Sequence, residues 1–213
     1  MKIFIDTASL EEINYWNDRI VLDGVTTNQK IFLAEKGVNF KERVMAICDT
    51  IKDDVSIELT EKSVHGMIKE AEKYSTWADN IVIKVPMTVN GDGLGVVRSL
   101  ALENIKTNAT CMMTADQLIL AAQAGADYVS LFYNRSKDSG LDPDKELEKA
   151  SLVIGDCQII VGSIRNVDDM SNALFAGADV VTMPPKILKE ILNNKKTKET
   201  IKEFDDAWKE FKK

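Results

Sequence analysis

Short apolar runs alternate with longer amphipathic segments along the whole chain. Eight runs of five or six residues have the composition of strands: residues 2–7, 24–28, 55–59, 81–86, 107–111, 128–132, 158–163 and 180–184. The segments between them place apolar residues at helical spacing, as in 39–51, 64–74, 115–125 and 167–177. Several runs are apolar on both faces, as buried parallel strands are. This alternation predicts a parallel α/β fold.

A weak internal repeat indicates how the sheet closes. The sequence AGADYVS at 124–130 returns as AGADVVT at 176–182, which is 52 residues later, or two units of about 26 residues. In both copies a glycine ends a helical segment directly before an apolar run, as at a junction of helix and strand. Eight such units fill the 213 residues and close naturally into a (β/α)8 TIM barrel.

A doubly wound open sheet is the alternative fold. Such a sheet usually carries a phosphate-binding glycine loop after its first strand. Here DTASLEE follows the first run, and the glycine-rich NGDGLG at 90–95 follows the fourth run without matching G-x-G-x-x-G. The barrel is therefore favoured.

The C-terminal region continues beyond the eighth run with a short helix at 186–193 and then a helical arm at about 197–213. Four apolar residues of the arm fall on one face at helical spacing: Ile201, Phe204, Trp208 and Phe211. The arm either packs on its own barrel or docks on a neighbouring subunit. Because no linker or second domain is visible, we expect residues 1–213 to form a single barrel domain with this arm.

Charge and cysteine content exclude several classes of function. The chain has 27 Lys+Arg against 34 Asp+Glu, a net charge of −7, which argues against broad binding of nucleic acids or anionic membranes. Cys48, Cys111 and Cys157 lie far apart and form neither a disulfide framework nor a zinc pattern. The N-terminus lacks the pattern of a signal peptide, and no apolar run approaches the ~20 residues that span a bilayer. We expect a cytoplasmic protein.

The single histidine, His65, also limits the chemistry. It excludes metal sites with several histidines, and because it starts a helical segment and is expected at the surface, it argues against Ser-His-Asp and Cys-His catalysis. We therefore expect neither a metal nor a cofactor.

Polar side chains gather at the C-terminal ends of the predicted strands, where barrel enzymes place their chemistry. These residues are Asp6, Thr26, Asn28, Glu58, Lys84, Asn108, Thr110, Ser130 and Ser163. Charged side chains inside apolar strands are costly to bury unless they are paired. The pattern therefore predicts one shared polar cluster.

Lys84 is the sharpest candidate in this cluster. It lies within the apolar run IVIKVP at 81–86, where desolvation favours the neutral amine, which can attack a carbonyl and form a Schiff base. Such an adduct is also the simplest electron sink for breaking a carbon–carbon bond without a metal. The alternative is a structural lysine neutralised by an acid on a neighbouring strand.

Glu58 and Asp6 are the candidate acids. Glu58 ends the strand before that of Lys84 and could shuttle protons directly or through a water held by Thr110; alternatively it is a plain counter-ion. Asp6 could take the proton of a sugar hydroxyl as the bond breaks. Its alternative role is a helix N-cap, for which Ser9, directly before LEE, is better placed.

Two of the five arginines are candidate phosphate ligands. Arg135 and Arg165 follow the sixth and seventh runs, where barrel enzymes often hold a phosphate, and a guanidinium matches phosphate oxygens bidentately. The alternative is a pair of surface arginines. Arg19, Arg43 and Arg98 lie in helical segments and are expected to be solvated.

An ordered set of short motifs carries a family resemblance over nearly the whole chain. It comprises FIDTA at 4–8, GVTTN at 24–28, IKVPMT at 83–88, TNAT at 107–110, Asn134-Arg135 and GSIRN at 162–166. The chain resembles the transaldolase family, especially its small single-barrel branch, which includes the fructose-6-phosphate aldolases. The resemblance implies a class I aldolase-like barrel.

The resemblance also implies a role for each matching residue. Lys84 matches the Schiff-base lysine, Asp6 the acid that handles the C4 hydroxyl proton, and Glu58 with Thr110 the pair that holds the catalytic water. Residues matching or neighbouring those that hold the dihydroxyacetone part are Asn28, Asn108, Ser130 and Ser163, and we add Thr26 and Phe132 to this binding set. Arg135 and Arg165 match the phosphate-binding arginines. Small members commonly form homo-oligomers, decamers of two pentameric rings, in which the C-terminal helix reaches a neighbour.

Two positions favour one branch of the family. In the family that this chain resembles, the aldolase branch has Gln at the position of Glu58 and Tyr at the position of Phe132. Transaldolases have Glu and Phe at these positions, as this chain does. The expected activity is transfer of a dihydroxyacetone unit from a ketose phosphate, of the fructose 6-phosphate or sedoheptulose 7-phosphate class, to an aldose phosphate of the pentose phosphate pathway. Aldolase-type cleavage of fructose 6-phosphate is one alternative. A non-catalytic sugar-phosphate-binding barrel is another, although binding alone needs no desolvated lysine.

Departures from the family pattern open a third alternative. Gln29-Lys30 stands where the family has Pro-Ser, and Tyr133-Asn134 stands where transaldolases usually have Val-Gly. Lys30 is thus an added candidate cation for the substrate. A sulfonated sugar such as 6-deoxy-6-sulfofructose is the variant substrate that these changes suggest.

Overall fold

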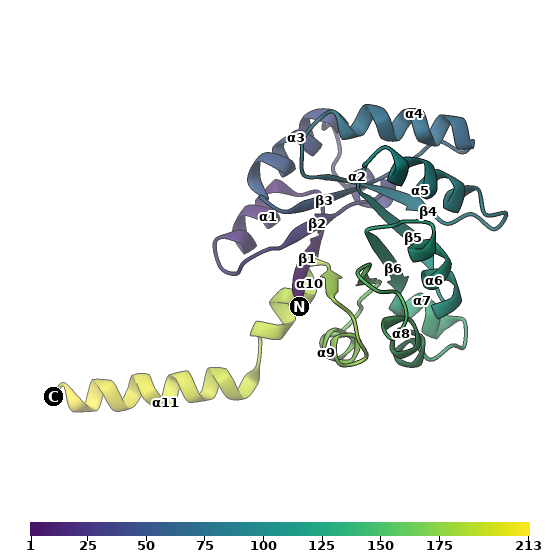
Figure 1. Ribbon diagram of the computed structural model, residues 1–213. Helices are drawn as coiled ribbons and strands as arrows, with labels where there is room; N and C mark the ends of the chain where they lie inside the picture. Colours follow the sequence, from purple (N-terminus) through teal and green to yellow (C-terminus); the bar gives the residue numbers. More distant parts are fainter.

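The computed structural model describes residues 1–213 and contains a closed barrel of eight parallel strands (Figure 1). The strands are β1 (Lys2–Asp6), β2 (Gly24–Thr26), β3 (Asp54–Glu58), β4 (Ile81–Pro86), β5 (Thr107–Met112), β6 (Tyr128–Phe132), β7 (Gln158–Gly162) and β8 (Val180–Met183). They follow chain order around the barrel, and β8 closes on β1. The predicted (β/α)8 barrel is confirmed.

Eleven helices follow or separate these strands. They are α1 (Leu10–Asn17), α2 (Gln29–Ala34), α3 (Phe40–Thr50), α4 (Val64–Ser75), α5 (Asp92–Leu102), α6 (Ala115–Gln123), α7 (Tyr133–Asp138), α8 (Pro143–Ser151), α9 (Val167–Phe175), α10 (Pro185–Leu192) and α11 (Lys195–Phe211). Ser9 caps α1 by accepting a bond from the backbone N–H of Glu12, as predicted. The short helices α2 and α7 directly follow β2 and β6, and they carry Lys30 and Arg135.

The repeated AGAD sequence has a structural explanation. Each aspartate accepts a backbone N–H at the start of the neighbouring strand: Asp127 accepts from Thr107 at 2.7 Å, and Asp179 accepts from Ile159 at 2.8 Å. The glycines of the two copies adopt left-handed backbone angles that other residues rarely adopt (Gly125, φ 99°; Gly177, φ 109°). The repeat therefore anchors the start of a strand immediately after a helix ends.

The barrel interior is filled by a small apolar cluster, separate from the larger core between barrel and helices. The cluster comprises Phe4, Val82, Tyr128, Ile160 and Val180. Alternate residues of a strand face the same side, so the side chains two positions further on (Asp6, Lys84, Ser130, Gly162, Thr182) also face inward. All five of these line one cavity at the C-terminal end of the barrel. A dry layer thus lies directly beneath the polar one.

The C-terminal helix α11 extends away from the barrel (Figure 1). All of its residues except Thr200 are exposed. Its predicted apolar face is open to solvent, with Phe204 70% and Phe211 79% exposed. The helical arm is therefore present and does not pack on its own barrel. No helix of the chain is both long and apolar enough to cross a membrane.

Candidate active site

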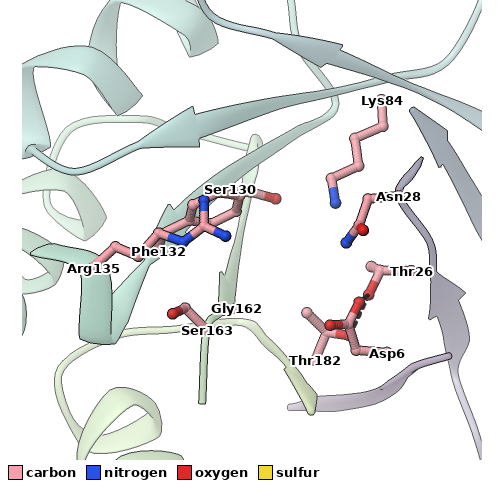
Figure 2. Close-up of a pocket in the computed structure, with 10 residues that line it drawn as sticks. All are labelled: Asp6, Thr26, Asn28, Lys84, Ser130, Phe132, Arg135, Gly162, Ser163 and Thr182. Atoms are coloured by element: carbon pink, nitrogen blue, oxygen red, sulfur yellow. Dashed lines mark hydrogen bonds between the residues drawn. The ribbon is translucent and has the colours of Figure 1, made fainter. Parts of the chain in front are cut away.

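A polar cavity of about 100 Å³ opens at the C-terminal end of the barrel (Figure 2). Its lining comes from six strands and the segments that follow them: Asp6, Thr26, Asn28, Lys84, Ser130, Phe132, Arg135, Gly162, Ser163 and Thr182. Eight of these residues belong to the predicted site; Gly162 and Thr182 do not. Six of the nine residues of the predicted polar cluster therefore line one cavity: Asp6, Thr26, Asn28, Lys84, Ser130 and Ser163.

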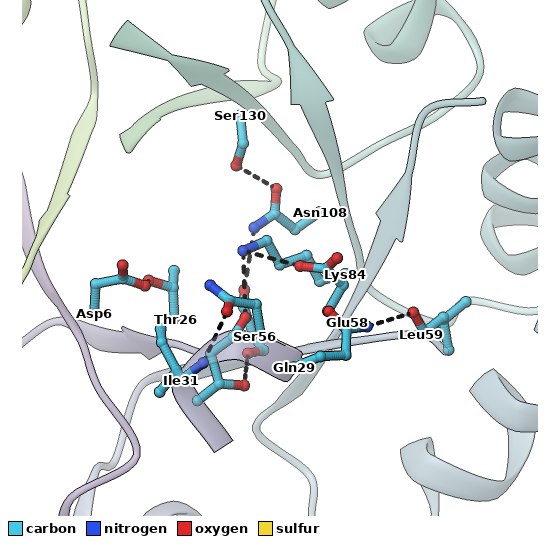
Figure 3. A network of polar contacts seen from close by, with 12 residues as sticks. Asp6, Thr26, Gln29, Ile31, Ser56, Glu58, Leu59, Lys84, Asn108 and Ser130 are labelled. Atoms are coloured by element: carbon cyan, nitrogen blue, oxygen red, sulfur yellow. Dashed lines mark hydrogen bonds and ion pairs between the residues drawn. The ribbon is translucent and has the colours of Figure 1, made fainter. Parts of the chain in front are cut away.

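Lys84 is buried beside this cavity, with 5% of its surface exposed. On β4 it pairs with Glu58 on β3 and with Asn108 on β5. Its Nζ lies 3.5 Å from Glu58 Oε2 and donates to the backbone oxygen of Thr27 at 3.3 Å (Figure 3). These partners hold the amine in place at the edge of the cavity.

Asp6 lies across the cavity from Lys84, at the end of β1 (Figure 2). Burial raises the pKa of its carboxyl, and the positive charges of Lys84 and Arg135 and a hydrogen bond from Thr26 offset this only in part. The Thr26 hydroxyl donates to Asp6 Oδ1 at 2.7 Å. A carboxylate with a raised pKa is a stronger base, which suits it to accept a hydroxyl proton.

Glu58 borders a second cavity, of about 370 Å³, that lies beside the first and is mostly apolar. Its lining is Thr27, Asn28, Gln29, Phe32, Leu33, Phe40, Ile57, Glu58, Thr60 and Tyr74. Gln29 contributes to this wall and donates to the backbone oxygen of Leu59 at 2.9 Å. Asn28 lines both cavities. Glu58 therefore contacts Lys84 on one side and a separate apolar space on the other.

Asn108 and Thr110 on β5 are fully buried and do not line the polar cavity. Asn108 donates to Ser56 Oγ at 3.2 Å and accepts from Ser130 Oγ at 2.7 Å (Figure 3). Asn108 thus orients a residue that does line the cavity. The Thr110 hydroxyl has no hydrogen-bond partner within the chain, which is unusual for a buried polar group.

The segments after β6 and β7 form the part of the cavity at which an anion is predicted to bind. Arg135 lines the cavity, and its guanidinium lies over the ring of Phe132 at 4.7 Å from the centroid. Ser163 adopts a left-handed backbone with φ 60°. For a residue other than glycine this conformation is strained, and such strain clusters at functional sites.

A buried amide and a buried carboxylate join these two segments. Asn134 donates to the backbone oxygen of Ser163 at 2.8 Å and to Asp169 at 2.6 Å. Asp169 also accepts the backbone N–H of Arg165 at 2.9 Å. Asn134 therefore connects the β6–α7 segment to the β7–α9 segment. It is one of the two residues that depart from the usual transaldolase pattern.

Two predicted binding residues lie outside the cavity lining. The Arg165 guanidinium is exposed and forms paired hydrogen bonds with the Asp138 carboxylate at 3.0 and 2.5 Å. Lys30 is exposed on α2 and forms no hydrogen bond or ion pair. Their roles toward a substrate stay predictions.

The sequence interpretation missed four residues of the site: Ser56, Gly162, Asp169 and Thr182. Ser56 and Thr182 each interrupt an apolar strand at an inward-facing position, two residues from another inward-facing residue. The two-residue spacing along these strands could therefore have identified both residues from the sequence. Asp169 follows Asn166 by three residues, the spacing of a capping box, which the structure contains.

Comparisons with known proteins identify the family of this chain. The model of the transaldolase/fructose-6-phosphate aldolase family matches residues 3–213. A probable transaldolase of Desulforapulum autotrophicum is 40% identical, with 98% of each chain covered, and one of Nitrosopumilus maritimus is 39% identical, covering 100% of this chain and 96% of its own. The chain belongs to the transaldolase/fructose-6-phosphate aldolase family of enzymes.

A solved structure supports the fold alone. Inosine 5′-monophosphate dehydrogenase from Legionella pneumophila superposes with a TM-score of 0.62 at 16% identity, over 88% of this chain and 58% of the other. At this identity the similarity extends to the barrel architecture, which many unrelated activities share.

The raised pKa of Asp6 predicts a stabilising substitution. Above that pKa the folded state holds a carboxylate whose burial is unfavourable, and this penalty disappears as the pH falls below the ordinary aspartate value of about 3.9. Asp6→Asn keeps an oxygen for Thr26 and should raise the free energy of unfolding at pH 7 by about 1 kcal/mol.

The measurement is chemical denaturation of both proteins between pH 7 and pH 4. The gain should shrink as the pH is lowered. The exposed-loop variant Asp156→Asn should show no such trend. An Asp6→Asn protein that is folded but no more stable than the wild type at pH 7 would contradict the expected sign.

Proposed function

We propose that this enzyme transfers a dihydroxyacetone unit from a ketose phosphate to an aldose phosphate through a Schiff base on Lys84. The observation that carries the proposal is a buried lysine amine on the wall of a polar cavity, with one carboxylate 3.5 Å away and a second one across the cavity. Membership in the transaldolase/fructose-6-phosphate aldolase family supports the same reaction class.

The first half of the proposed reaction joins the donor to the enzyme. Lys84 Nζ attacks the C2 carbonyl of the ketose, and the carbinolamine loses water to form the protonated Schiff base. Glu58 is close enough to Nζ to exchange the protons that these steps require, either directly or through a water bound by the Thr110 hydroxyl.

The second half breaks and remakes a carbon–carbon bond. Asp6 accepts the proton of the C4 hydroxyl, the C3–C4 bond breaks, and its electron pair moves into the iminium to form an enamine. The aldose phosphate leaves, and the enamine carbon attacks the aldehyde of the acceptor. Asp6 returns the proton to the new hydroxyl. Hydrolysis of the Schiff base then releases the product and restores the free amine of Lys84.

Transfer rather than release is supported by Phe132. Release of free dihydroxyacetone requires protonation of the enamine carbon and then hydrolysis of the imine. Phe132 lines the cavity and supplies no hydroxyl to deliver that proton. The enamine therefore persists until an acceptor aldehyde arrives. Cleavage of the fructose-6-phosphate aldolase type is the alternative outcome.

A phosphate is the terminal anion that we favour for the donor and the acceptor. Arg135 lines the cavity, and Arg165 would join it by exchanging the Asp138 carboxylate for the substrate. Phosphate near neutral pH is close to doubly charged and a sulfonate carries one charge, so two guanidinium groups should prefer phosphate. A sulfonated sugar contacting Lys30 is the alternative.

Assembly and location are further parts of the proposal. We infer that the exposed apolar face of α11, with Ile201, Phe204, Trp208 and Phe211, docks on another copy of the chain in a homo-oligomer, either a pentamer or a decamer. The three cysteines are all free, which supports a reducing compartment such as the cytoplasm.

Removal of the nucleophile tests the mechanism directly. Wild-type enzyme treated with fructose 6-phosphate and borohydride should gain a covalent mass, whereas Lys84→Met should gain none and lose turnover by at least ~10³-fold. Lys145→Met, which removes an exposed lysine of α8, serves as the control. Near-native turnover in Lys84→Met, or a wild type that binds the sugar but never traps it, would overturn the Schiff-base mechanism.

A hydroxyl added beside the enamine should shift the enzyme toward cleavage. Phe132→Tyr is expected to raise the ratio of dihydroxyacetone release to transfer about tenfold, because a positioned proton donor accelerates protonation. The ratio is measured with fructose 6-phosphate in the absence and presence of erythrose 4-phosphate. Phe132→Leu, which adds no hydroxyl, should leave the ratio low; an unchanged ratio in folded Phe132→Tyr would count against this explanation.

The phosphate site predicts a loss of affinity rather than of chemistry. Arg165→Ala should weaken binding of phosphorylated donors, because the phosphate loses one of its two proposed guanidinium partners. KM should rise more than kcat falls, because the ground state and the transition state share the phosphate. Arg98→Ala, which alters an exposed arginine of α5, is the control. Identical kinetics for wild type and Arg165→Ala on phosphorylated and sulfonated sugars would rule out Arg165 as an anion ligand.

A further inference from the structure

Three side chains from neighbouring strands form a short hydrogen-bonded chain at the edge of the polar cavity (Figure 2). Thr182 Oγ1 on β8 lies 2.6 Å from Thr26 Oγ1 on β2, and Thr26 Oγ1 lies 2.7 Å from Asp6 Oδ1 on β1. Thr26 is 1% exposed and Thr182 6% exposed. Water therefore competes little for these bonds.

The direction of each bond follows from the available hydrogens. An ionised carboxylate only accepts, so Thr26 donates its single hydroxyl hydrogen to Asp6. Thr26 then has only lone pairs left for Thr182, so Thr182 is the donor in the second bond. The chain runs from Thr182 through Thr26 to Asp6.

We propose that Thr182 is a positioning residue for cleavage of the carbon–carbon bond: its hydroxyl polarises and orients Thr26, which in turn holds Asp6 in the ionised, proton-accepting form. This inference rests on the proposed role of Asp6. A hydroxyl that accepts a hydrogen bond becomes a better donor, and a donor to a carboxylate favours the charged form. Thr182 thus acts on the reaction through Thr26 without exchanging a proton with the sugar.

Thr26 is the only side chain that donates a hydrogen bond to the Asp6 carboxylate. The charged groups that face Asp6 are Lys84 from β4 and Arg135 from α7. The two strands that pair with β1, which are β2 and β8, contribute no charged side chain and present Thr26 and Thr182 instead. Changing Thr182 therefore alters the hydrogen bonding of Asp6 and leaves every nearby charge in place.

The test compares Thr182→Val, which has nearly the same shape and no hydroxyl, with Thr182→Ser, which keeps the hydroxyl. Without the donor the carboxylate is less stabilised, so the acidic limb of the kcat profile should move up by about half a pH unit in Thr182→Val. The Thr182→Ser enzyme should keep the wild-type limb, and KM should change little in both.

A double-mutant comparison identifies Thr26 as the intermediary. In a Thr26→Val background, adding Thr182→Val should leave the acidic limb where Thr26→Val alone puts it, because the connection to Asp6 is already broken. An independent second shift in the double variant would contradict a chain through Thr26. A raised KM with an unmoved limb in Thr182→Val would instead make Thr182 a substrate contact and overturn the proposal.

Borohydride trapping separates this inference from the proposed function. Wild type and Thr182→Val should both trap fructose 6-phosphate on Lys84 to the same extent, because Thr182 does not contact the amine. If both trap and the limb does not move, the inference about Thr182 fails while the Schiff-base function stands. If a folded, sugar-binding wild type does not trap, the proposed function fails, and the inference fails with it.

Discussion

Burial of one lysine at the centre of the barrel mouth is the constraint on which the site depends. An ammonium group removed from water must be paired or hydrogen-bonded. Lys84 meets this requirement through Glu58 on the adjacent strand and through the backbone oxygen of Thr27 after β2. The strand register therefore fixes the chemistry, because a shift of β3 against β4 by one residue would turn Glu58 away from the amine.

The interior of the barrel explains why these polar groups stay ordered. Phe4, Val82 and Val180 fill the layer directly below Asp6, Lys84 and Thr182. This layer is closed toward the N-terminal end by Tyr128, whose hydroxyl donates to Asp54, itself paired with Lys106 at 2.7 Å. Polar groups at the mouth such as Asp6 and Asn108 have hydrogen-bond partners on neighbouring strands, whereas the Thr110 hydroxyl is an exception. Hydrogen bonds in such an environment are stronger than in water.

The alternation of residues along each strand made part of the fold and of the site predictable from the sequence. Strand ends follow from local sequence, so the eight strands and the inward position of residues such as Lys84 and Asp6 could be predicted from the chain alone. The apolar cavity beside Glu58 could not be predicted in this way, because it depends on how α2 packs against α3. The rings of Phe32 and Phe40 meet there edge to face, with 4.7 Å between their centroids. The pairing of Arg165 with Asp138 could not be predicted from the sequence either, since the two residues lie 27 positions apart. Asp138 is at the end of α7, and Arg165 lies between β7 and α9.

The two carboxylates differ because their surroundings differ, and this difference suits a transfer enzyme. Glu58 lies 3.5 Å from the amine of Lys84 and borders an apolar cavity, which is the position that proton exchange with the amine requires. Asp6 accepts a hydrogen bond from Thr26, which is itself bonded to Thr182, and burial raises the pKa of Asp6 even though two cations face it. One acid can therefore serve the carbon–nitrogen steps while the other serves the carbon–carbon step. In the proposed mechanism, separate proton carriers would allow the enamine to wait for an acceptor, because neither acid would have to change partners between donor cleavage and acceptor addition.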